Sequence, residues 1–85
     1  MRRNVTYATS GIQSFHFPKA KWTLAEARRW LKSHGYKIDR RVDEPHFVEY
    51  RFRQEDPKKF KRLWKVAIRS RTFRKTLYML RGHLK

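Results

Sequence analysis

The stretch from Trp22 to Tyr36, WTLAEARRWLKSHGY, carries signals for both ends of one short helix. Thr23 is a favoured N-cap residue, and Glu26 stands three positions later, where its carboxylate can accept from the N–H of Thr23. Gly35 follows the last turn, where a left-handed backbone favours glycine, and Tyr36 takes the position of a Schellman-type apolar contact onto Leu31. The sequence therefore predicts a capped helix in this stretch.

This helix is amphipathic and requires a partner surface. Its apolar face carries Leu24, Ala27 and Leu31, with Trp30 and His34 beside them, and its basic face carries Arg28, Arg29 and Lys32. The partner is expected in the stretch from Phe47 to Arg53, which alternates with period two as a half-buried strand does. Its apolar side would consist of Val48, Tyr50 and Phe52, and its polar side of Glu49, Arg51 and Arg53.

Two further strands are expected before that one. Ile12 to Phe17 has strand composition and ends at Pro18, and a polar strand after Gly35 would place Ile38 and Val42 on one face. Asp43-Glu44-Pro45 has turn composition. Residues 1–11 have the composition of a basic arm, with a short extended piece at Val5 to Tyr7, and residues 12–85 are expected to form a single domain.

The last third of the chain allows two interpretations. Asp56-Pro57 is typical of a helix start, and an apolar series then follows helical spacing: Phe60, Leu63, Trp64, Ala67 and Ile68. Beyond it, Phe73, Leu77, Leu80 and Leu84 fit a helical stripe, while Thr76 to Leu80 equally fits a buried strand ended by Gly82. The expected fold is α+β: a small antiparallel sheet of three to four strands packed on one capped helix. A basic C-terminal segment completes this fold. It is expected to begin with a helical turn and to continue as a strand or a helix.

The charge balance gives the first indication of function. Lys and Arg number 23 against seven Asp and Glu, a formal net charge of +16, which attracts polyanions. Nucleic acid is the leading expected partner, ahead of an anionic membrane or an acidic protein surface. The chain has no cysteine, no apolar run that could span a bilayer and no signal-peptide pattern. We expect a soluble protein that works inside a cell or a particle.

Two basic clusters are candidate contacts for phosphate. The 29 residues from Pro57 onward contain no acidic residue, so a merely solvated face is a weaker explanation there. Trp64 and Tyr78 stand among these charges and are candidates for base stacking or for the core. The sequence shows no helix-turn-helix or zinc-finger spacing, which favours binding to the backbone with little sequence specificity. The candidate residues are Arg28, Arg29, Lys32, Lys58, Lys59, Lys61, Arg62, Lys65, Arg69, Arg71, Arg74 and Lys75.

Catalytic and metal patterns are weak. The four histidines, His16, His34, His46 and His83, are scattered, and the acidic pairs Asp43-Glu44 and Glu55-Asp56 stand beside prolines in turn contexts. No glycine-rich phosphate loop is present, and Ser10, Ser14, Ser33 and Ser70 have no nucleophile context. We therefore expect a protein that is not an enzyme and that has no metal and no cofactor.

The stretches KAKWTLAEARRWLKSHGYKIDRRVDE and EYRFRQEDPKKFKR resemble a small domain found in proteins of phages and large DNA viruses. The likeness covers about residues 12–62, and LYMLRGHLK fits the closing strand only loosely, without the glycine turn that usually precedes it. The resemblance implies an α+β unit of viral or prophage origin and no particular activity. It makes a virion structural role, such as minor capsid or head assembly, the alternative function, with a location in the virion or inside the host cell. Inhibition of a host nucleic-acid enzyme is a third interpretation. The matching residues are Lys21-Trp22-Thr23, Ala27, Trp30-Leu31, His34-Gly35, Tyr50 to Gln54, Pro57 and Phe60.

Overall fold

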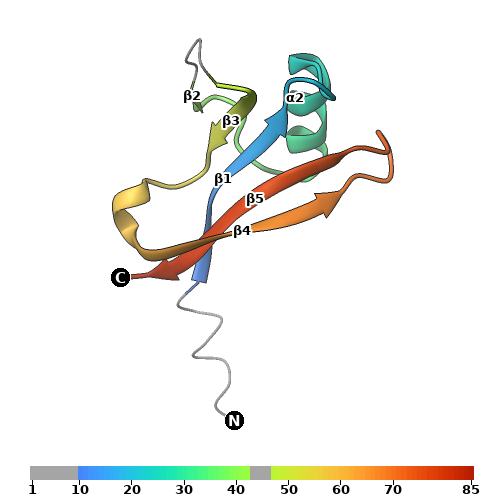
Figure 1. Cartoon of the computed structure of the whole chain (residues 1–85). Helices are drawn as coiled ribbons and strands as arrows, with labels where there is room; N and C mark the ends of the chain where they lie inside the picture. Colours follow the sequence, from blue (N-terminus) through green and yellow to red (C-terminus); the bar gives the residue numbers. More distant parts are fainter. Residues whose placement is uncertain (1–9, 43–46) are drawn as a thin grey trace.

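The computed structural model describes residues 10–42 and 47–85, which form a five-stranded antiparallel sheet and one α-helix (Figure 1). The order of strands across the sheet is β2-β3-β1-β5-β4, so the first strand lies at the centre. The predicted α+β class, with an antiparallel sheet and one helix, is confirmed, but the sheet has five strands rather than three to four. The elements are β1 (Ser10–Pro18), α2 (Leu24–Ser33), β2 (Arg41–Val42), β3 (Glu49–Arg53), a 3₁₀ turn η1 (Pro57–Lys59), β4 (Phe60–Arg69) and β5 (Thr76–Leu84).

Both predicted ends of the helix are present. The Thr23 side chain accepts from the N–H of Glu26 at 3.1 Å, and the Glu26 carboxylate accepts from the N–H of Thr23 at 3.0 Å. At the other end Gly35 has φ 79°, and the N–H of Tyr36 donates to the carbonyl of Leu31 at 2.9 Å. These are the bonds of a capping box and of a Schellman end, so local sequence alone defines the limits of α2.

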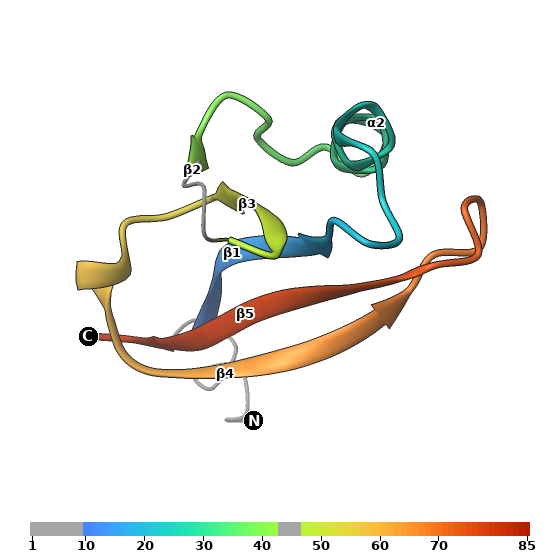
Figure 2. The same ribbon diagram turned by 45° about the horizontal axis from the view of Figure 1, so that its top comes forward.

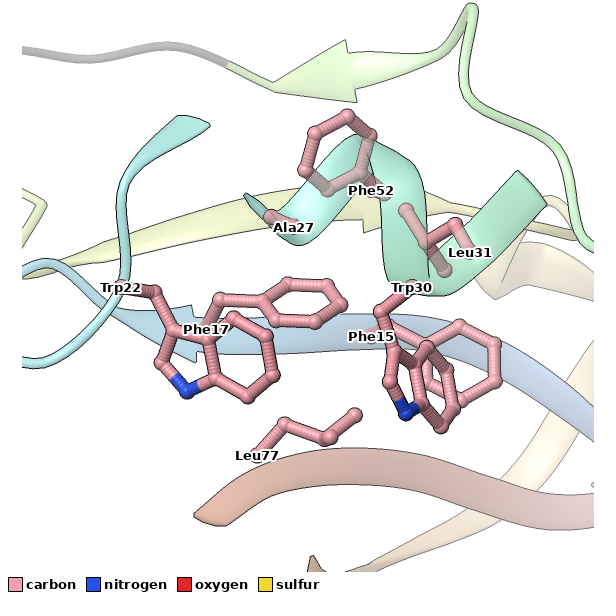
Figure 3. Close-up of a cluster of buried hydrophobic side chains, with 8 residues drawn as sticks. All are labelled: Phe15, Phe17, Trp22, Ala27, Trp30, Leu31, Phe52 and Leu77. Carbon is pink, nitrogen blue, oxygen red and sulfur yellow. The ribbon is translucent and has the colours of Figure 1, made fainter. Parts of the chain in front are cut away.

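The core lies between α2 and one side of the sheet (Figures 2 and 3). Ala27, Trp30 and Leu31 of the helix are buried, as the sequence predicts, while Leu24 is half-buried and His34 is exposed. The strands contribute Phe15, Phe17, Phe52 and Leu77, each fully buried, and Trp22 from the turn before α2 completes the cluster. Close aromatic contacts hold this cluster, because edge-to-face rings add to the free energy of apolar burial.

The central strand β1, and not β3 alone, is the partner of the helix. Phe15 lies 5.4 Å from the ring of Trp30, and Phe17 lies 5.9 Å from that of Phe52. The expected apolar side of β3 is correct for Phe52, which is buried, and for Tyr50, which packs against the core. It is wrong for Val48, whose side chain is 75% exposed because β3 begins only at Glu49.

Trp22 joins the start of the helix to the loop between β4 and β5. Its indole Nε1 donates to the backbone carbonyl of Thr76 at 2.9 Å, and its ring lies 4.9 Å from Phe17 and 5.4 Å from Phe73. Lys75 from the same loop pairs with Glu26 at 2.7 Å. The tip of the β4–β5 hairpin, at the right in Figure 1, is therefore attached to the helix N-terminus.

The helical interpretation of the series from Phe60 to Ile68 is wrong, because after the single 3₁₀ turn this segment is strand β4. A helix would place Lys58 beside Arg62 and Lys65 beside Arg69, each at a four-residue spacing where like charges repel. In the strand, Val66 and Ile68 pair with Met79 and Leu77 on the covered side, and Lys65 and Arg69 lie on the other side, about 13 Å apart along the strand. Pairing with β5 therefore determines the structure of this segment, despite the helical spacing of its apolar residues.

The strand interpretation of Thr76 to Leu80 is confirmed, but Gly82 does not end it, since β5 continues to Leu84. A Cβ on Gly82 would collide with the carbonyl oxygen of Arg62 and would lie 2.7 Å from Leu63 Cδ2 and 3.0 Å from the ring of Phe60. Phe60 is buried at this place. Gly82 therefore allows β4 to approach β5 closely, and it does not form a turn.

The remaining expected pieces are short or lie outside the described residues. Only Arg41 and Val42 form the polar strand after the helix, and Ile38 precedes it. The Asp43-Glu44-Pro45 turn and residues 1–9 of the basic arm lie outside the described residues, while Ser10 and Gly11 belong to β1. Within the described ranges, no helix has the length and apolarity needed to cross a bilayer.

Candidate nucleic-acid interface

The side of the sheet opposite α2, here called the open face, is defined by the strand register. Phe15 pairs with Phe52 and Met79 on the covered side, so its neighbour His16, which pairs with Arg51 and Tyr78, points to the other side. The same alternation places the following residues on the open face: Ser14 and His16 of β1, Glu49, Arg51 and Arg53 of β3, Lys65, Ala67 and Arg69 of β4, and Thr76, Tyr78 and Leu80 of β5.

The open face is strongly cationic. Arg51 and Arg53 project from β3, and Lys65 and Arg69 project from β4 on the other side of β1 and β5. Glu49 is the one acidic residue among the strands that the structure describes. Its carboxylate lies 3.4 Å from both Arg51 Nε and His16 Nδ1, so it offsets part of the local charge and leaves an excess of cations.

A recess of about 210 Å³, here called the central hollow, opens on this face between β1 and β3. The polar lining consists of Gln13, Ser14, His16, Arg51 and Arg53, and the apolar walls are Val42, Pro57 and Leu80. A few convergent polar groups between apolar walls are typical of a ligand site.

The two arginines of the central hollow have buried Nε atoms that make no hydrogen bond among the described residues. The Nε of Arg51 has the Glu49 carboxylate 3.4 Å away, whereas that of Arg53 has no acceptor. A buried donor without an acceptor costs about 1–3 kcal/mol relative to a satisfied one. Arg51 is also held in place, because its guanidinium carbon lies 3.9 Å from the centroid of the Phe47 ring.

A chain of hydrogen bonds forms the floor of the central hollow. Gln13 Nε2 donates to the carbonyl of Glu55 at 3.2 Å, and Ser14 Oγ donates to Gln13 Oε1 at 2.8 Å. His16 Nε2 lies 2.9 Å from Ser14 Oγ, in a hydrogen bond whose donor depends on the tautomer of the ring. The imidazole is thus held by neighbours on β1, with Nδ1 facing Glu49.

The environment of His16 opposes protonation of its ring. Burial lowers the pKa of His16 below its usual value, Glu49 acts in the opposite direction, and the cations Arg51 and Lys65 lower it further. The ring is therefore neutral in the folded protein at neutral pH, and it would gain a proton most readily if more negative charge arrived in the hollow.

Ser14, His16 and Glu49 stand in the order of a serine–histidine–carboxylate relay. No nucleophile context was recognisable around Ser14 in the sequence, because Glu49 comes from a separate strand, although His16 stands two residues later on β1. However, the hydroxyl hydrogen of Ser14 is directed to Gln13 and not to the imidazole, and the serine is only 4% exposed. A nucleophile needs its base as hydrogen-bond acceptor and access to substrate, so this geometry favours an ordered floor.

A second recess, here called the hairpin hollow, lies where β4 and β5 meet the turn after β1. It measures about 590 Å³, and four cations line it: Lys21, Arg69, Arg74 and Lys75. Tyr78 also lines it, and Lys65 Nζ lies 5.5 Å from the centroid of that ring. Tyr78 pairs with His16 of the central hollow, so the two hollows open on the same face.

Arg74 has an unusual backbone conformation. Its φ is 56°, in the left-handed region that non-glycine residues occupy at a cost of about 1–2 kcal/mol. No other non-glycine residue in the described ranges has a positive φ. The loop therefore holds an arginine beside the hairpin hollow at a position where glycine would be less strained.

The structure separates the predicted basic residues into groups. Arg28, Arg29 and Lys32 are exposed on α2, on the side of the sheet opposite the open face, and Arg62 points to the covered side of β4. Lys59 and Lys75 form ion pairs with Glu55 and Glu26. Lys58 and Lys61 are exposed at η1 and at the start of β4, and Arg71 is exposed in the hairpin loop. The group that converges on the open face and its hairpin hollow is Lys65, Arg69, Arg74 and Lys75.

The two predicted stacking residues lie on opposite faces. Tyr78 is half-buried on the open face, whereas Trp64 is 38% exposed on the other side of β4, with its ring 5.0 Å from that of His83. Only Tyr78 therefore belongs to the surface described above.

Sequence reasoning missed four residues of this surface: Lys21, His16, Arg51 and Arg53. The alternation of β3 contains the signal for the two arginines, because assigning Tyr50 and Phe52 to the core assigns Arg51 and Arg53 to the other face. Among the residues with described positions, no three His, Asp or Glu side chains come together as metal ligands. Comparison of the chain with protein-family models, with curated proteins and with solved structures gave no match.

Proposed function

We propose that this protein binds nucleic acid through the phosphate backbone, with the open face as the main contact surface. The observation that carries the proposal is the cation excess there: Arg51, Arg53, Lys65 and Arg69 against the single carboxylate of Glu49. The hairpin hollow extends the same surface with Lys21 and further basic side chains. Clustered cations of this kind neutralise phosphates and release counterions, which gives affinity without base recognition.

The geometry also explains why backbone contacts are favoured over groove reading. The one α-helix of the described ranges uses its apolar face for the core, and its basic face lies away from the open face. No recognition helix is thus available there, and a sheet face lined with long cationic side chains matches phosphates by charge rather than bases by pattern.

Fluorescence anisotropy of labelled single-stranded DNA, duplex DNA and heparin, at several salt concentrations, tests this proposal. If about six phosphates are neutralised, affinity falls about a thousandfold between 50 and 200 mM salt. No binding to any of the three polyanions at 50 mM salt would overturn the proposal.

Two triple variants with equal charge change locate the surface. Changing Arg53, Lys65 and Arg69 to Gln removes three charges from the open face, so the slope of log affinity against log salt should weaken by about 2.7. Changing Arg28, Arg29 and Lys32 to Gln removes three charges from α2 and should leave that slope nearly unchanged. The opposite ranking would place the contact surface on the helix.

A structural role in a virion, and with it a viral or prophage origin, stays a prediction based on the sequence resemblance. Among residues 10–42 and 47–85, large apolar side chains are exposed at four positions, but they form no common patch on the sheet, since Leu63 and Trp64 point to opposite faces. The other two are Ile38 and Val48. This distribution does not favour a protein–protein interface over a nucleic-acid surface.

A further inference from the structure

We propose that the central hollow is a phosphate-binding subsite in which Arg51 and Arg53 hold one phosphate group of a nucleic-acid strand above His16. This inference rests on the proposed function and assigns its most specific contact. The remaining cations of the open face then act as a general attraction for the strand.

Arg51 and Arg53 are alternate residues of β3 that point to the same side, and both line the hollow with buried Nε atoms. The Nε of Arg53 has no acceptor among the described residues, whereas that of Arg51 makes no hydrogen bond but lies 3.4 Å from the Glu49 carboxylate. An arginine donor in such a position is suited to an anionic oxygen, because the planar guanidinium fork matches phosphate geometry.

The surroundings of the central hollow favour an anion. Val42, Pro57 and Leu80 form apolar walls, so an anion in the hollow would be partly shielded from water and its attraction to the guanidinium groups would be strengthened. His16 at the floor faces Glu49 and Arg51 of β3, Lys65 of β4, Tyr78 of β5 and its own neighbour Ser14. Cations outnumber the single carboxylate around it, which suits an added anion.

The depth of the central hollow restricts which ligand groups can reach its floor. The floor of the hollow lies at the level of the sheet, since Ser14 and His16 are more than nine-tenths buried. A ligand group must therefore project into the hollow. A terminal phosphate projects in this way, and so does an internal phosphate of a flexible single strand. The terminal and the internal phosphate present the same anionic oxygens, and the experiments below distinguish between them.

The pKa of the His16 imidazole reports whether a phosphate occupies the central hollow. Nearby negative charge favours the protonated ring, so a bound phosphate should raise the pKa of His16, typically by about one unit or more. The experiment is an NMR titration of the His16 ring of the wild-type protein, with and without inorganic phosphate, at constant ionic strength set with sodium chloride. An unchanged His16 pKa at saturating phosphate would overturn the proposal.

Matched variants then test the arginines. Arg53→Gln should weaken binding of a single-stranded thymidine octamer by about ten- to hundredfold and should abolish the shift of His16, because one charge-assisted contact is lost. Arg40→Gln, an equal charge change at an exposed side chain just before β2, should do neither. Equal losses in the two variants would overturn the proposal. Thermal unfolding of each variant verifies that it folds, and the wild-type phosphate titration needs no substitution.

Arg53→Lys separates geometry from charge. It keeps the positive charge but lacks the Nε donor and the planar fork, so it should recover only part of the affinity. Full recovery would show that charge alone suffices and would contradict a shaped subsite.

Octamers with a 5′-phosphate and with a 5′-hydroxyl identify the source of the phosphate. Tighter binding of the phosphorylated octamer assigns the hollow to a strand end, and equal binding with equal shifts of His16 assigns it to an internal phosphate. If nucleic acid binds while His16 does not respond, the subsite fails and the proposed function stands. If phosphate shifts His16 while no polyanion binds, the proposed function fails.

Discussion

Arg74 is the residue at which stability and binding should respond in opposite directions. A residue with a Cβ in this left-handed backbone conformation destabilises the folded protein by about 1–2 kcal/mol, and glycine would remove that cost. Glycine also has more conformational freedom in the unfolded chain, which reduces the net stabilisation by about 0.5–1 kcal/mol. Arg74→Gly should therefore raise the free energy of unfolding by about 0.5–1 kcal/mol. For a domain of this size the melting temperature should rise by about 2–8 °C, measured by thermal unfolding followed by circular dichroism.

The same substitution removes a cation from the hairpin hollow. If Arg74 contacts phosphate, the slope of log affinity against log salt should weaken by about 0.9. Arg71→Gly is the matched control: it makes the same charge change in the same loop, but Arg71 is not in the left-handed region, so glycine should lower its melting temperature. The strain argument is refuted if Arg74→Gly lowers the melting temperature as Arg71→Gly does. An unchanged salt slope would remove Arg74 from the interface.

Three further outcomes follow from the fold. Gly82→Ala should destabilise the protein by about 1–3 kcal/mol in denaturant unfolding, because its Cβ meets the Arg62 carbonyl and the Leu63 side chain, and unchanged stability would contradict the close approach. Folding lowers the pKa of His16, so the unfolded chain binds that proton more readily and stability should fall as pH drops from about 7 to 5. His16→Gln should flatten this dependence, and an equally steep profile would exclude His16 as its source. Thr23→Ala should cost about 0.5–2 kcal/mol through loss of the N-cap, measured by thermal unfolding against Ala25→Ser, an exposed control on the same helix.

Local signals were sufficient where an element is specified by its own residues. The limits of α2 follow from Thr23, Glu26 and Gly35, and all their predicted bonds are present. The alternation of β3 likewise identified Phe52 as a core residue. These features could be predicted because the interactions that stabilise them join residues close together in the sequence, such as Leu31 and Tyr36, or repeat along one strand.

The C-terminal third could not be assigned in this way. Its apolar residues fit a helical period, yet the segment is a strand because β4 and β5 form a long hairpin that places Ile68 opposite Leu77. The energy of that pairing depends on residues far apart in the sequence, which a local period does not contain. The repulsion between Lys65 and Arg69 at helical spacing was an available signal against the helix.

The sequence predicted the charge of the candidate surface, but the densest run of basic residues did not indicate its position in the fold. A basic cluster on the sequence becomes one surface only when its residues share a face, and β4 sends Arg62 to one side of the sheet and Lys65 to the other. A single helix covers a single face of a sheet, so the polar side of every strand it packs on must remain open. With one helix predicted, the alternation of β3 already implied that Arg51 and Arg53 lie there. The outward residues of the best-defined strand, rather than the densest run of charge, were thus the stronger guide to the site.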